Sequence, residues 1–502
     1  MELELQADPD TVAGMSRLKA LAREGRPRSQ VFKVVWHDSP DQTLLSQGLI
    51  LAEQRGRWRL ERVLPAAETW LPGQPPPVLQ ESQEPTALTA GLPVRLAPVA
   101  AFQGRRTVSE HRIEEAPVTL LIECGVLRSV TAEQAVARIQ LSGADHAVHA
   151  AALVIANAAA VWVPRASLAA RAIALASGGV PVPRRLGPPV LPGVGMTVAA
   201  ALTHILGHLT DVILHHAPVA AQSDAKDVPD ANRVEAVHQM RVAVRRALSA
   251  ISVFRGALPD GALDRVHDGL KTLGATLGFT RDWDVFVGET APMIAKALPP
   301  DKKLDRLIAA AVRRRHDHRA ALAHHLQSPA FRVLGIELAW FALHFWPASA
   351  DVSPDGPDQD RLDQVPAERS LVADFAPGVL QHRWKKLTSV GKQIETLDIP
   401  ALHELRLRAK RARYAAEMFA GLDNGRAAHR FIRRLSVLQQ RLGLLNDAAV
   451  AAQLLDELGG SAGRHGYAVG IVVGFTASRA GKLRPQIIRA FEKFRRQPIY
   501  WT

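Results

Sequence analysis

The chain of 502 residues carries a formal net charge of +13 at pH 7, which favours a polyanionic partner or an anionic membrane without distinguishing between them. Its length suggests several domains, and a 47% share of hydrophobic residues is enough to fill their cores. A single cysteine, Cys124, excludes an internal disulfide and agrees with a reducing compartment. The acidic N-terminal stretch and the short apolar runs lead us to expect neither a signal peptide nor a membrane span.

Residues 1–175 predict an α+β domain with an antiparallel β-tunnel or barrel-like sheet, because several stretches have the alternation or the β-branched content of strands. These stretches are MELELQ, SQVFKVVWHD, LILAEQRGRWRLERVL, PVTLLIECG and ARIQLSG, and the third is expected to be a hairpin that turns near Gly56. We expect helices at residues 131–137 and 146–160. The proline-rich residues 72–93 are expected to be irregular.

Residues 176–195 are dense in proline and glycine and are interpreted as a linker. After the linker the pattern is helical and rich in alanine, which predicts an all-α domain over residues 196–495. The acidic, proline-containing residues 347–366 separate it into halves of about 196–346 and 367–495. Short connections favour antiparallel bundles. The expected helices span residues 196–216, 232–255, 262–277, 282–298, 302–325, 330–345, 375–392, 400–420, 426–442, 446–458 and 464–493.

One stretch of the helical region occurs twice. Residues 237–256, VHQMRVAVRRALSAISVFRG, are matched by residues 402–421, LHELRLRAKRARYAAEMFAG, at an offset of 165 residues (403 − 238 = 165). The same offset relates the downstream pieces LGFTRDWDV and LQQRLGLLNDAAV. Two ungapped matches at one offset indicate an internal duplication.

Both copies place basic side chains along one face of a helix, because residues three, four and seven apart share a side. The predicted anion-binding residues are His238, Arg241, Arg245 and Arg246 in the first copy, and His403, Arg406, Lys410, Arg411 and Arg413 in the second. Neighbouring like charges repel by roughly 0.2–0.5 kcal/mol per pair, so such a face is either well solvated or suited to an anion. Its presence in both copies favours the anion. The two histidines are expected to stay neutral until an anion favours their protonation.

The acidic residues of the piece LGFTRDWDV can be interpreted in two ways. Next to Arg281, Asp282 and Asp284 could form a catalytic carboxylate pair, but acids in the first turn of a helix are the favoured explanation. Asn446 and Asp447 fit the same capping role in the second copy.

The run RRRHDHRAALAHHL is interpreted as a basic helix, although His318 and His325 could share a face and bind a metal. A second tier of basic residues could extend the anion-binding surface. It consists of Arg313, Arg319, Lys385 and Lys386.

The repeated pattern H-x-x-R-x-x-x-[RK]-R, together with its downstream pieces, resembles the CHAD domain, the conserved histidine α-helical domain, over about residues 195–490. The resemblance implies two four-helix bundles related by a pseudo-twofold axis, with the two motif helices facing a central basic pore. It also implies binding of inorganic polyphosphate and association with polyphosphate granules.

The first 175 residues resemble a second family, the CYTH or triphosphate-tunnel domain, through MELELQ and WHDSPDQTLLSQGLIL. That family is an antiparallel barrel that holds a triphosphate among basic side chains and a divalent metal on carboxylates. Glu2 and Glu4 remain as residual metal candidates, but Gln6 replaces the expected lysine, and Arg138 and Gln140 replace the late carboxylates. Because a hard cation needs clustered oxygen ligands, the domain is interpreted as degenerate, and Mg²⁺ or Mn²⁺ is expected only if it is active.

The sequence therefore predicts a cytoplasmic protein without a cofactor that binds inorganic polyphosphate through the two basic helices. We expect it on polyphosphate granules, where granule-associated proteins could be further partners. Two alternatives remain: a metal-dependent triphosphatase or polyphosphatase acting through the N-terminal domain, or nonspecific binding of nucleic acid. Only nine Trp, three Tyr and fourteen Phe are present, without the interleaving of a stacking platform, which disfavours the nucleic-acid alternative.

Overall fold

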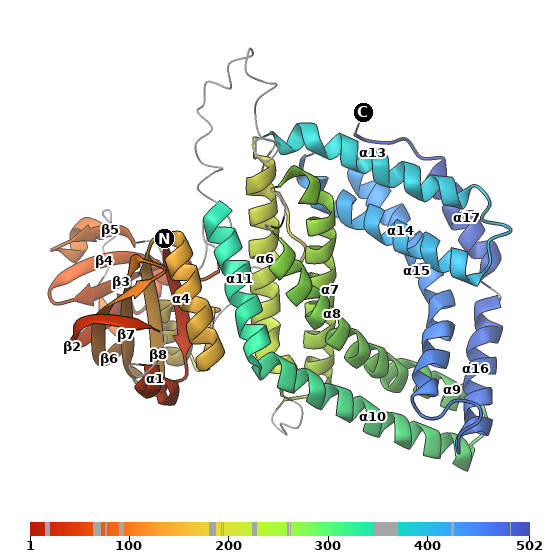
Figure 1. Cartoon of the computed structure of the whole chain (residues 1–502), viewed down its shortest axis with the longest axis horizontal. Coiled ribbons are helices and arrows are strands. Elements are labelled where there is room, and N and C mark those ends of the chain that lie inside the picture. The colour runs from red at the N-terminus through yellow and green to blue at the C-terminus, as the bar shows by residue number, and fades with distance from the viewer. Residues whose placement is uncertain are drawn as a thin grey trace. The chain divides into compact units, whose positions relative to one another are not determined.

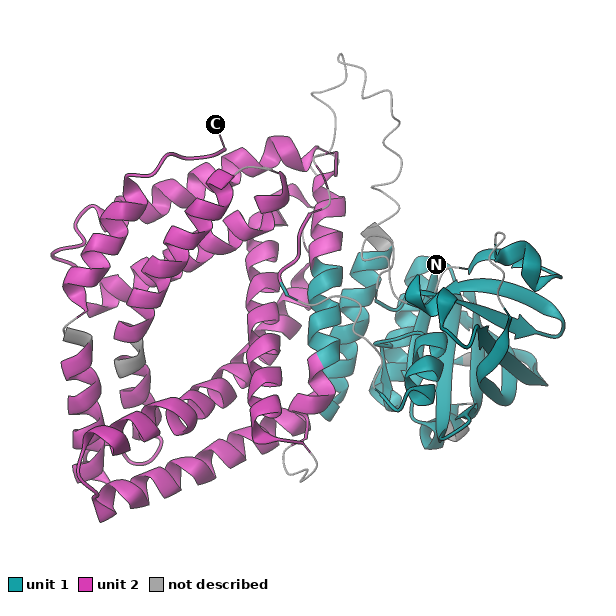
Figure 2. Ribbon diagram, turned by 180° about the vertical axis from the view of Figure 1, so that it is seen from behind, with its two compact units in different colours: residues 1–187, 206–215, 327–350 teal, residues 188–205, 216–326, 351–502 magenta. Residues whose placement is uncertain are grey.

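The structure is a computed structural model whose described residues are 1–15, 21–63, 72–75, 78–89, 95–179, 187–191, 193, 195–222, 228–258, 261, 263–345, 370–422, 426–481 and 483–501. They divide into two compact units (Figure 2). The first unit comprises residues 1–187, 206–215 and 327–350, and the second comprises residues 188–205, 216–326 and 351–502. The predicted acidic segment, residues 347–366, lies outside the described residues.

The first unit is built on one antiparallel sheet (Figure 1), as the sequence predicts for the N-terminal region. Its described strands are β1 (Glu2–Ala7), β2 (Ala22–Asp38), β3 (Leu49–Gln54), β4 (Arg57–Arg62), β5 (Val78–Ser82), β6 (Ala97–Ile113), β7 (Ala116–Ser129), β8 (Glu133–Gly143) and β9 (Val161–Trp162). They lie in the order β5-β4-β3-β2-β6-β7-β8-β1-β9. Within the described strands the series ends at β5 and β9, and no closing pair joins those two strands into a barrel.

Two local predictions for the first unit are wrong. Residues 131–137 do not form a helix, because β8 covers most of them and pairs with β7 along its length. Val136 and Ala137 are both buried, on opposite faces of the sheet, and this burial overrides the helix-favouring composition. The proline-rich residues 72–93 contain β5 and the short helix α3 (Pro85–Leu88), which has proline in its first turn.

The alternation of β1 divides its side chains between two faces of the sheet. Leu3 and Leu5 enter a core formed with β7, β8, the helix α4 (Asp145–Ala158) and residues of α11 (Pro329–Phe345). Glu4 and Gln6 point to the other face, where β2, β3 and β6 build a second core with α5 (Leu168–Ala176). The remaining described helices of this unit are α1 (Pro9–Met15) and α2 (Thr43–Ser46).

The second unit is helical, which confirms the predicted helical C-terminal region. Its described helices are α7 (Asp230–Phe254), α8 (Asp264–Val285), the π-helical turn η2 (Phe286–Thr290), α9 (Ala291–Ala297), α10 (Lys302–Gln327), α13 (Val372–Gly391), α14 (Ile399–Met418), α15 (Arg426–Asp456), α16 (Gly466–Gly481) and α17 (Arg484–Arg495), with short 3-10 turns η1 (Arg255–Ala257) and η5 (Ala420–Leu422). In Figures 1 and 2 these helices follow one another around a frame, with α10 along one edge and α15 and α16 along another.

Helix α6 (Val198–Ala220) contributes residues to both units. It is the one helix among the described residues that is long and apolar enough to cross a membrane by length and composition. In this structure 94% of its most apolar 18-residue window is buried inside the protein, which is the environment of a core helix.

Helix α8 is longer than predicted. The predicted helices 262–277 and 282–298 are wrong as separate elements, because α8 runs through the expected break and continues through η2 into α9. Leu277, Thr280 and Trp283 are buried at helical spacing across that point, so packing carries the helix past it.

Two further helix boundaries differ from the predicted ones. Residues 426–442 and 446–458 belong to the single helix α15. Residues 464–493 form two helices, α16 and α17, and Pro485 lies in the first turn of the latter, where proline is tolerated.

The two repeated stretches lie on α7 and α14, and these helices contact each other through aromatic side chains. Phe254 and Phe419, which are equivalent in the repeat, are both buried, and their ring centroids lie 6.0 Å apart. Phe375 of α13 stacks on Phe254 with a centroid distance of 5.4 Å. These rings hold the C-terminal ends of the two basic helices together.

Candidate anion-binding site

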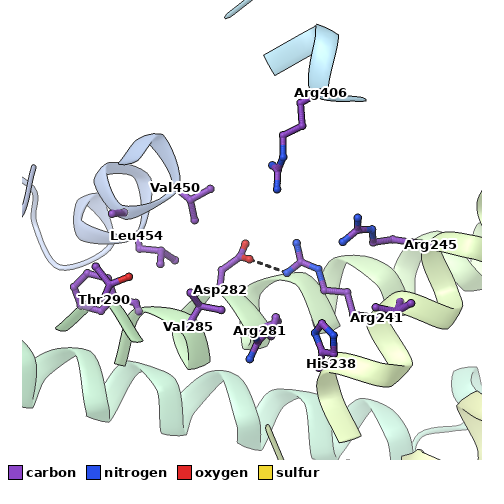
Figure 3. Close-up of a pocket in the computed structure, with 13 residues that line it drawn as sticks. His238, Arg241, Arg245, Arg281, Asp282, Val285, Thr290, Arg406, Val450 and Leu454 are labelled. Atoms are coloured by element: carbon purple, nitrogen blue, oxygen red, sulfur yellow. Dashed lines mark hydrogen bonds and ion pairs between the residues drawn. The ribbon is translucent and has the colours of Figure 1, made fainter. Parts of the chain in front are cut away.

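A pocket of about 220 Å³ in the second unit brings residues of both repeated helices together (Figure 3). Its lining residues are His238, Arg241, Val242 and Arg245 of α7, Arg281, Asp282 and Val285 of α8, Phe286 and Thr290 of η2, Arg406 of α14, and Val450, Ala451 and Leu454 of α15. In this lining Asp282 is the one carboxylate, against four arginines and a histidine. The pocket therefore carries an excess of positive charge at neutral pH.

Arg245 is partly buried in the pocket wall and lacks a counter-ion. No hydrogen bond or ion pair joins its guanidinium to any described residue, and its Nε atom is buried without a partner. Its guanidinium carbon lies 5.9 Å from the ring centroid of Tyr414. Burial, with the neighbouring charges of Arg241, Arg406 and Arg413, lowers the pKa of Arg245 to about 10, so the group stays charged at pH 7. An unpaired charge in such a place is costly, and a bound anion would offset the cost.

Arg241 is held in place by α8. Its Nη1 atom donates to the backbone oxygen of Gly278 at 2.9 Å and to Oδ1 of Asp282 at 2.7 Å. Arg406, its counterpart in the repeat, lies against Gly443, the counterpart of Gly278. A side chain added at Gly443 would place its Cβ atom only 3.7 Å from Nη2 of Arg406. The two arginines therefore lie against equivalent glycines, and both reach the pocket.

His238 begins the basic stripe of α7, and its surroundings favour its neutral form. Burial and the positive charge of Arg281 lower the pKa of His238, with further contributions from the arginines of α7 and an opposing effect of Glu235. Arg281 itself pairs with Glu289 of η2 at 3.3 Å. A bound anion would favour the imidazolium form of His238.

A second basic cluster surrounds Tyr414 between α7 and α14. The guanidinium carbons of Arg246 and Arg413 lie 5.9 and 5.4 Å from its ring centroid. Glu417 bridges the two arginines: its Oε2 accepts from Nη2 of Arg246 at 3.1 Å, and its Oε1 lies 3.4 Å from Nε of Arg413. One carboxylate therefore partly neutralises two of the predicted anion-binding arginines.

The other predicted residues lie outside this pocket lining. His403 and Arg411 are exposed on α14, and Lys410 is half-buried there. Burial and the nearby charge of Arg411 lower the pKa of Arg383 on α13. The second-tier residues with exposed side chains are Arg313 of α10 and Lys385 and Lys386 of α13.

Arg319 and the acids of α8 have structural roles that differ from the predicted ones. Arg319 is only 7% exposed; its Nη2 atom donates to Oδ1 of Asp284 at 2.6 Å, and its Nη1 atom pairs with Asp230. It is therefore unsuited to an anion-binding surface. The prediction that Asp282 and Asp284 cap a helix N-terminus is wrong, because α8 continues and both lie in its last turn. They neutralise Arg241 and Arg319 instead.

The histidine-rich run of α10 is engaged in packing where the chain is described. His318 lies 3.1 Å from a carboxylate oxygen of Glu457 and stacks on Phe279 with a centroid distance of 5.8 Å. The side chains of Asn446 and Asp447, for which a capping role is predicted, lie outside the described residues.

The residual metal candidates of the first unit face polar and basic partners. Glu4 is buried, and its Oε1 atom lies 3.8 Å from Nη1 of Arg138. Glu2 accepts a hydrogen bond from Nε2 of Gln140 at 3.2 Å. Arg138 also pairs with the fully buried Glu123. No group of three His, Cys, Asp or Glu side chains in the described ranges could hold a metal ion.

Several residues of the site are absent from the predicted anion-binding set. Arg281 and Asp282 lie in the downstream piece of the repeat. Its duplication indicates a role common to both copies, but the sequence does not show that these two side chains line the pocket. Glu417 follows Arg413 by four residues, the spacing of a helical ion pair, so the sequence did contain a signal for it. Tyr414 had no such signal, because its role depends on the contact between α7 and α14.

The second unit is thus a helical domain with a basic pocket. A comparison with known families identifies the family of this domain. The family model for the CHAD domain matches residues 201–456, about half of the chain. The chain belongs to the CHAD domain family. This match does not show the CYTH-like domain that the N-terminal sequence resembles.

Two solved structures give the extent of this similarity. The crystal structure of the CHAD domain from the plant Ricinus communis is 26% identical, with a TM-score of 0.52 over 64% of this chain and 99% of that chain. PptA from Streptomyces chartreusis is 16% identical, with a TM-score of 0.42 over 59% of this chain and 99% of that chain. No curated protein matches the chain.

Glu417→Gln removes the carboxylate that Arg246 and Arg413 share while keeping the size of the side chain. If these arginines bind a phosphate chain, the affinity for tripolyphosphate should rise roughly two- to tenfold, because one partly buried charge contributes about 0.5–1.4 kcal/mol. Isothermal titration calorimetry at fixed ionic strength measures this change. The matched control is Glu404→Gln, which frees the more exposed Arg408 and should change the affinity less than about twofold. An unchanged or lower affinity of the Glu417 variant would contradict the idea that Glu417 competes with the anion for Arg246 and Arg413.

Proposed function

We propose that the chain binds inorganic polyphosphate at the pocket of the second unit. The observation that carries the proposal is Arg245, a partly buried guanidinium among other arginines that lacks a counter-ion within the described residues. A multivalent anion is the ligand that offsets this charge. The guanidinium groups of Arg241 and Arg406 reach the same pocket from two helices, and their planar donors match phosphate oxygens.

Polyphosphate suits the site because its charges repeat along a chain. Each internal phosphate carries about one negative charge, and displacement of its counterions by basic side chains favours binding at low salt, as for nucleic acids. The exposed Arg411, Lys385 and Lys386 could continue the contact outside the pocket. The logarithm of the affinity should therefore fall with the logarithm of the salt concentration.

Membership of the CHAD family supports the same ligand, since the resemblance of the repeated motif to that family implies polyphosphate binding. We extend the proposal to location: a cytoplasmic protein held on polyphosphate granules, where it contacts granule-associated proteins. A fluorescent fusion that stays dispersed in cells with stained granules would contradict this location.

We also propose that residues 196–346 and 367–495 are two four-helix bundles related by a pseudo-twofold axis. The contact between the equivalent Phe254 and Phe419 supports this relation, as does the equivalent placement of Arg241 and Arg406 against glycines. Such an axis would explain how equivalent arginines reach one pocket. An experimental structure in which the two halves do not superpose would rule it out.

For the first unit we propose a degenerate CYTH-like scaffold without catalytic activity. The support is Arg138, whose guanidinium lies beside Glu4 and Glu123 and supplies the positive charge that a divalent metal would otherwise bring. The triphosphatase alternative therefore lacks a cluster of ligands in the described residues. We expect no release of phosphate from tripolyphosphate with Mg²⁺ or Mn²⁺. Release that disappears in a Glu4→Gln variant would establish the enzyme instead.

Joint replacement of motif residues by alanine tests the binding proposal. The variant with Arg241, Arg245, Arg406 and Lys410 all changed to Ala should lose polyphosphate binding, because the pocket loses three of its four arginines and α14 loses a neighbouring lysine. The circular dichroism spectrum should remain helical. The matched control removes the same number of charges from exposed lysines outside the predicted set, namely Lys271, Lys296, Lys302 and Lys392. Undiminished affinity in the first variant, or equal loss in the control, would refute the assignment.

The lowered pKa of His238 predicts a pH dependence. In the free protein the histidine binds its proton at a lower pH than in the unfolded chain, so it destabilises the fold as the pH falls below its ordinary pKa. A bound polyanion raises that pKa, so binding takes up a proton. The affinity for long-chain polyphosphate should therefore rise as the pH falls through this window, by at most about tenfold per pH unit for one proton.

The measurement is a titration at several pH values with long chains, because terminal phosphate groups themselves titrate near pH 6. His238→Gln should flatten the dependence while retaining binding. A slope that is the same in this variant would show that another group takes up the proton.

A further inference from the structure

The pocket of the second unit has two chemically different walls. One is basic, and its arginines come from α7, α8 and α14. The other is apolar and is formed by Val285, Phe286, Val450, Ala451 and Leu454. Figure 3 shows Val285, Val450 and Leu454 gathered near Thr290, on the far side of Asp282 from Arg245.

An inorganic phosphate chain uses only the basic wall. Its oxygens are charged and hydrated, and pressing them against aliphatic side chains would remove water without supplying hydrogen-bond donors. Val285 and Val450 are only half-buried, so they keep apolar surface open to the pocket. Covering such surface contributes about 25 cal/mol per Å². The ligand that uses both walls has an anionic part and an apolar, flat part.

We propose that this pocket binds a nucleoside polyphosphate, with its phosphates on Arg241, Arg245 and Arg406 and its base on the wall of Val285 and Val450. The proposal rests on the proposed function, because the same arginines hold the phosphates. A volume of about 220 Å³ is below the roughly 300–1,000 Å³ of pockets that enclose whole ligands. The base therefore fills the apolar side of the pocket while the phosphates extend along the arginines.

Asp282 and Thr290 supply the polar groups that a base needs. The Oδ1 atom of Asp282 accepts a hydrogen bond from Arg241, and its second carboxylate oxygen has no hydrogen bond with a described residue. That oxygen can accept from an exocyclic amino group, and the hydroxyl of Thr290 can donate or accept. Adenosine triphosphate, which carries such an amino group, is the probe of choice.

The test compares adenosine triphosphate with tripolyphosphate, which has the same three phosphates but no base. Both are titrated calorimetrically into the full chain at one ionic strength, with a chelator present to exclude divalent metals. The nucleotide should bind about fivefold more tightly or better, the gain expected from covering roughly 40 Å² of apolar surface. Equal or weaker binding of the nucleotide would overturn the proposal while leaving the anion site intact. Failure of both ligands to bind would count against the proposed function itself.

A near-isosteric variant locates the base. Val285→Thr combined with Val450→Thr makes the wall polar, so the affinity for the nucleotide should fall to that for tripolyphosphate, which itself should not change. Arg245→Gln is the comparison variant and should lower the affinities for both ligands by the same factor. Unchanged nucleotide affinity in the double threonine variant would place the base elsewhere. Thermal unfolding checks that both variants fold. The comparison of adenosine triphosphate with tripolyphosphate uses the wild-type protein and therefore tests the proposal even if a variant does not fold.

Discussion

The unpaired charge of Arg245 is the constraint on which the second unit depends. Its guanidinium lies near the ring of Tyr414 and among other arginines, and no described residue supplies a carboxylate for it. Such a charge costs several kcal/mol when it is taken out of water. The fold must offset this cost through packing elsewhere, for example where Phe254 and Phe419 join α7 to α14, or through a bound anion.

The carboxylates of the second unit reduce the repulsion among its arginines but leave the pocket with an excess of positive charge. Asp284 neutralises the buried Arg319 and has no part in the lining, so that pair serves the fold alone. Asp282 and Glu417 instead pair with arginines of the basic stripes, so under the proposed function they would compete with an incoming anion. The free protein is therefore partly neutralised, and the remaining charge is concentrated where two motif helices meet. This arrangement keeps the site charged and the helices packed at the same time.

The basic side of the pocket could be predicted because it follows from local geometry. Helical spacing places His238, Arg241 and Arg245 on one face, and the repeat indicates Arg406. The contact between Arg246 and Glu417 depends on the packing of α7 against α14, so it could not be derived from the sequence, whereas the spacing of Arg413 and Glu417 on one helix could. Misplaced boundaries have the same cause: β8 and the continuous α8 result from burial against distant segments, which overrides local composition. The apolar wall combines α8, η2 and α15, so no single stretch of sequence reveals it.

The measurement that tests the central claim most directly is a titration of the full chain with polyphosphates of increasing length, at fixed salt, with single-stranded RNA as a competitor. A site built from arginines on two helices should bind longer chains more tightly and should retain them against RNA. Displacement by RNA at an equal concentration of phosphate would contradict the account. It would mean that the net charge of +13 attracts polyanions without discrimination.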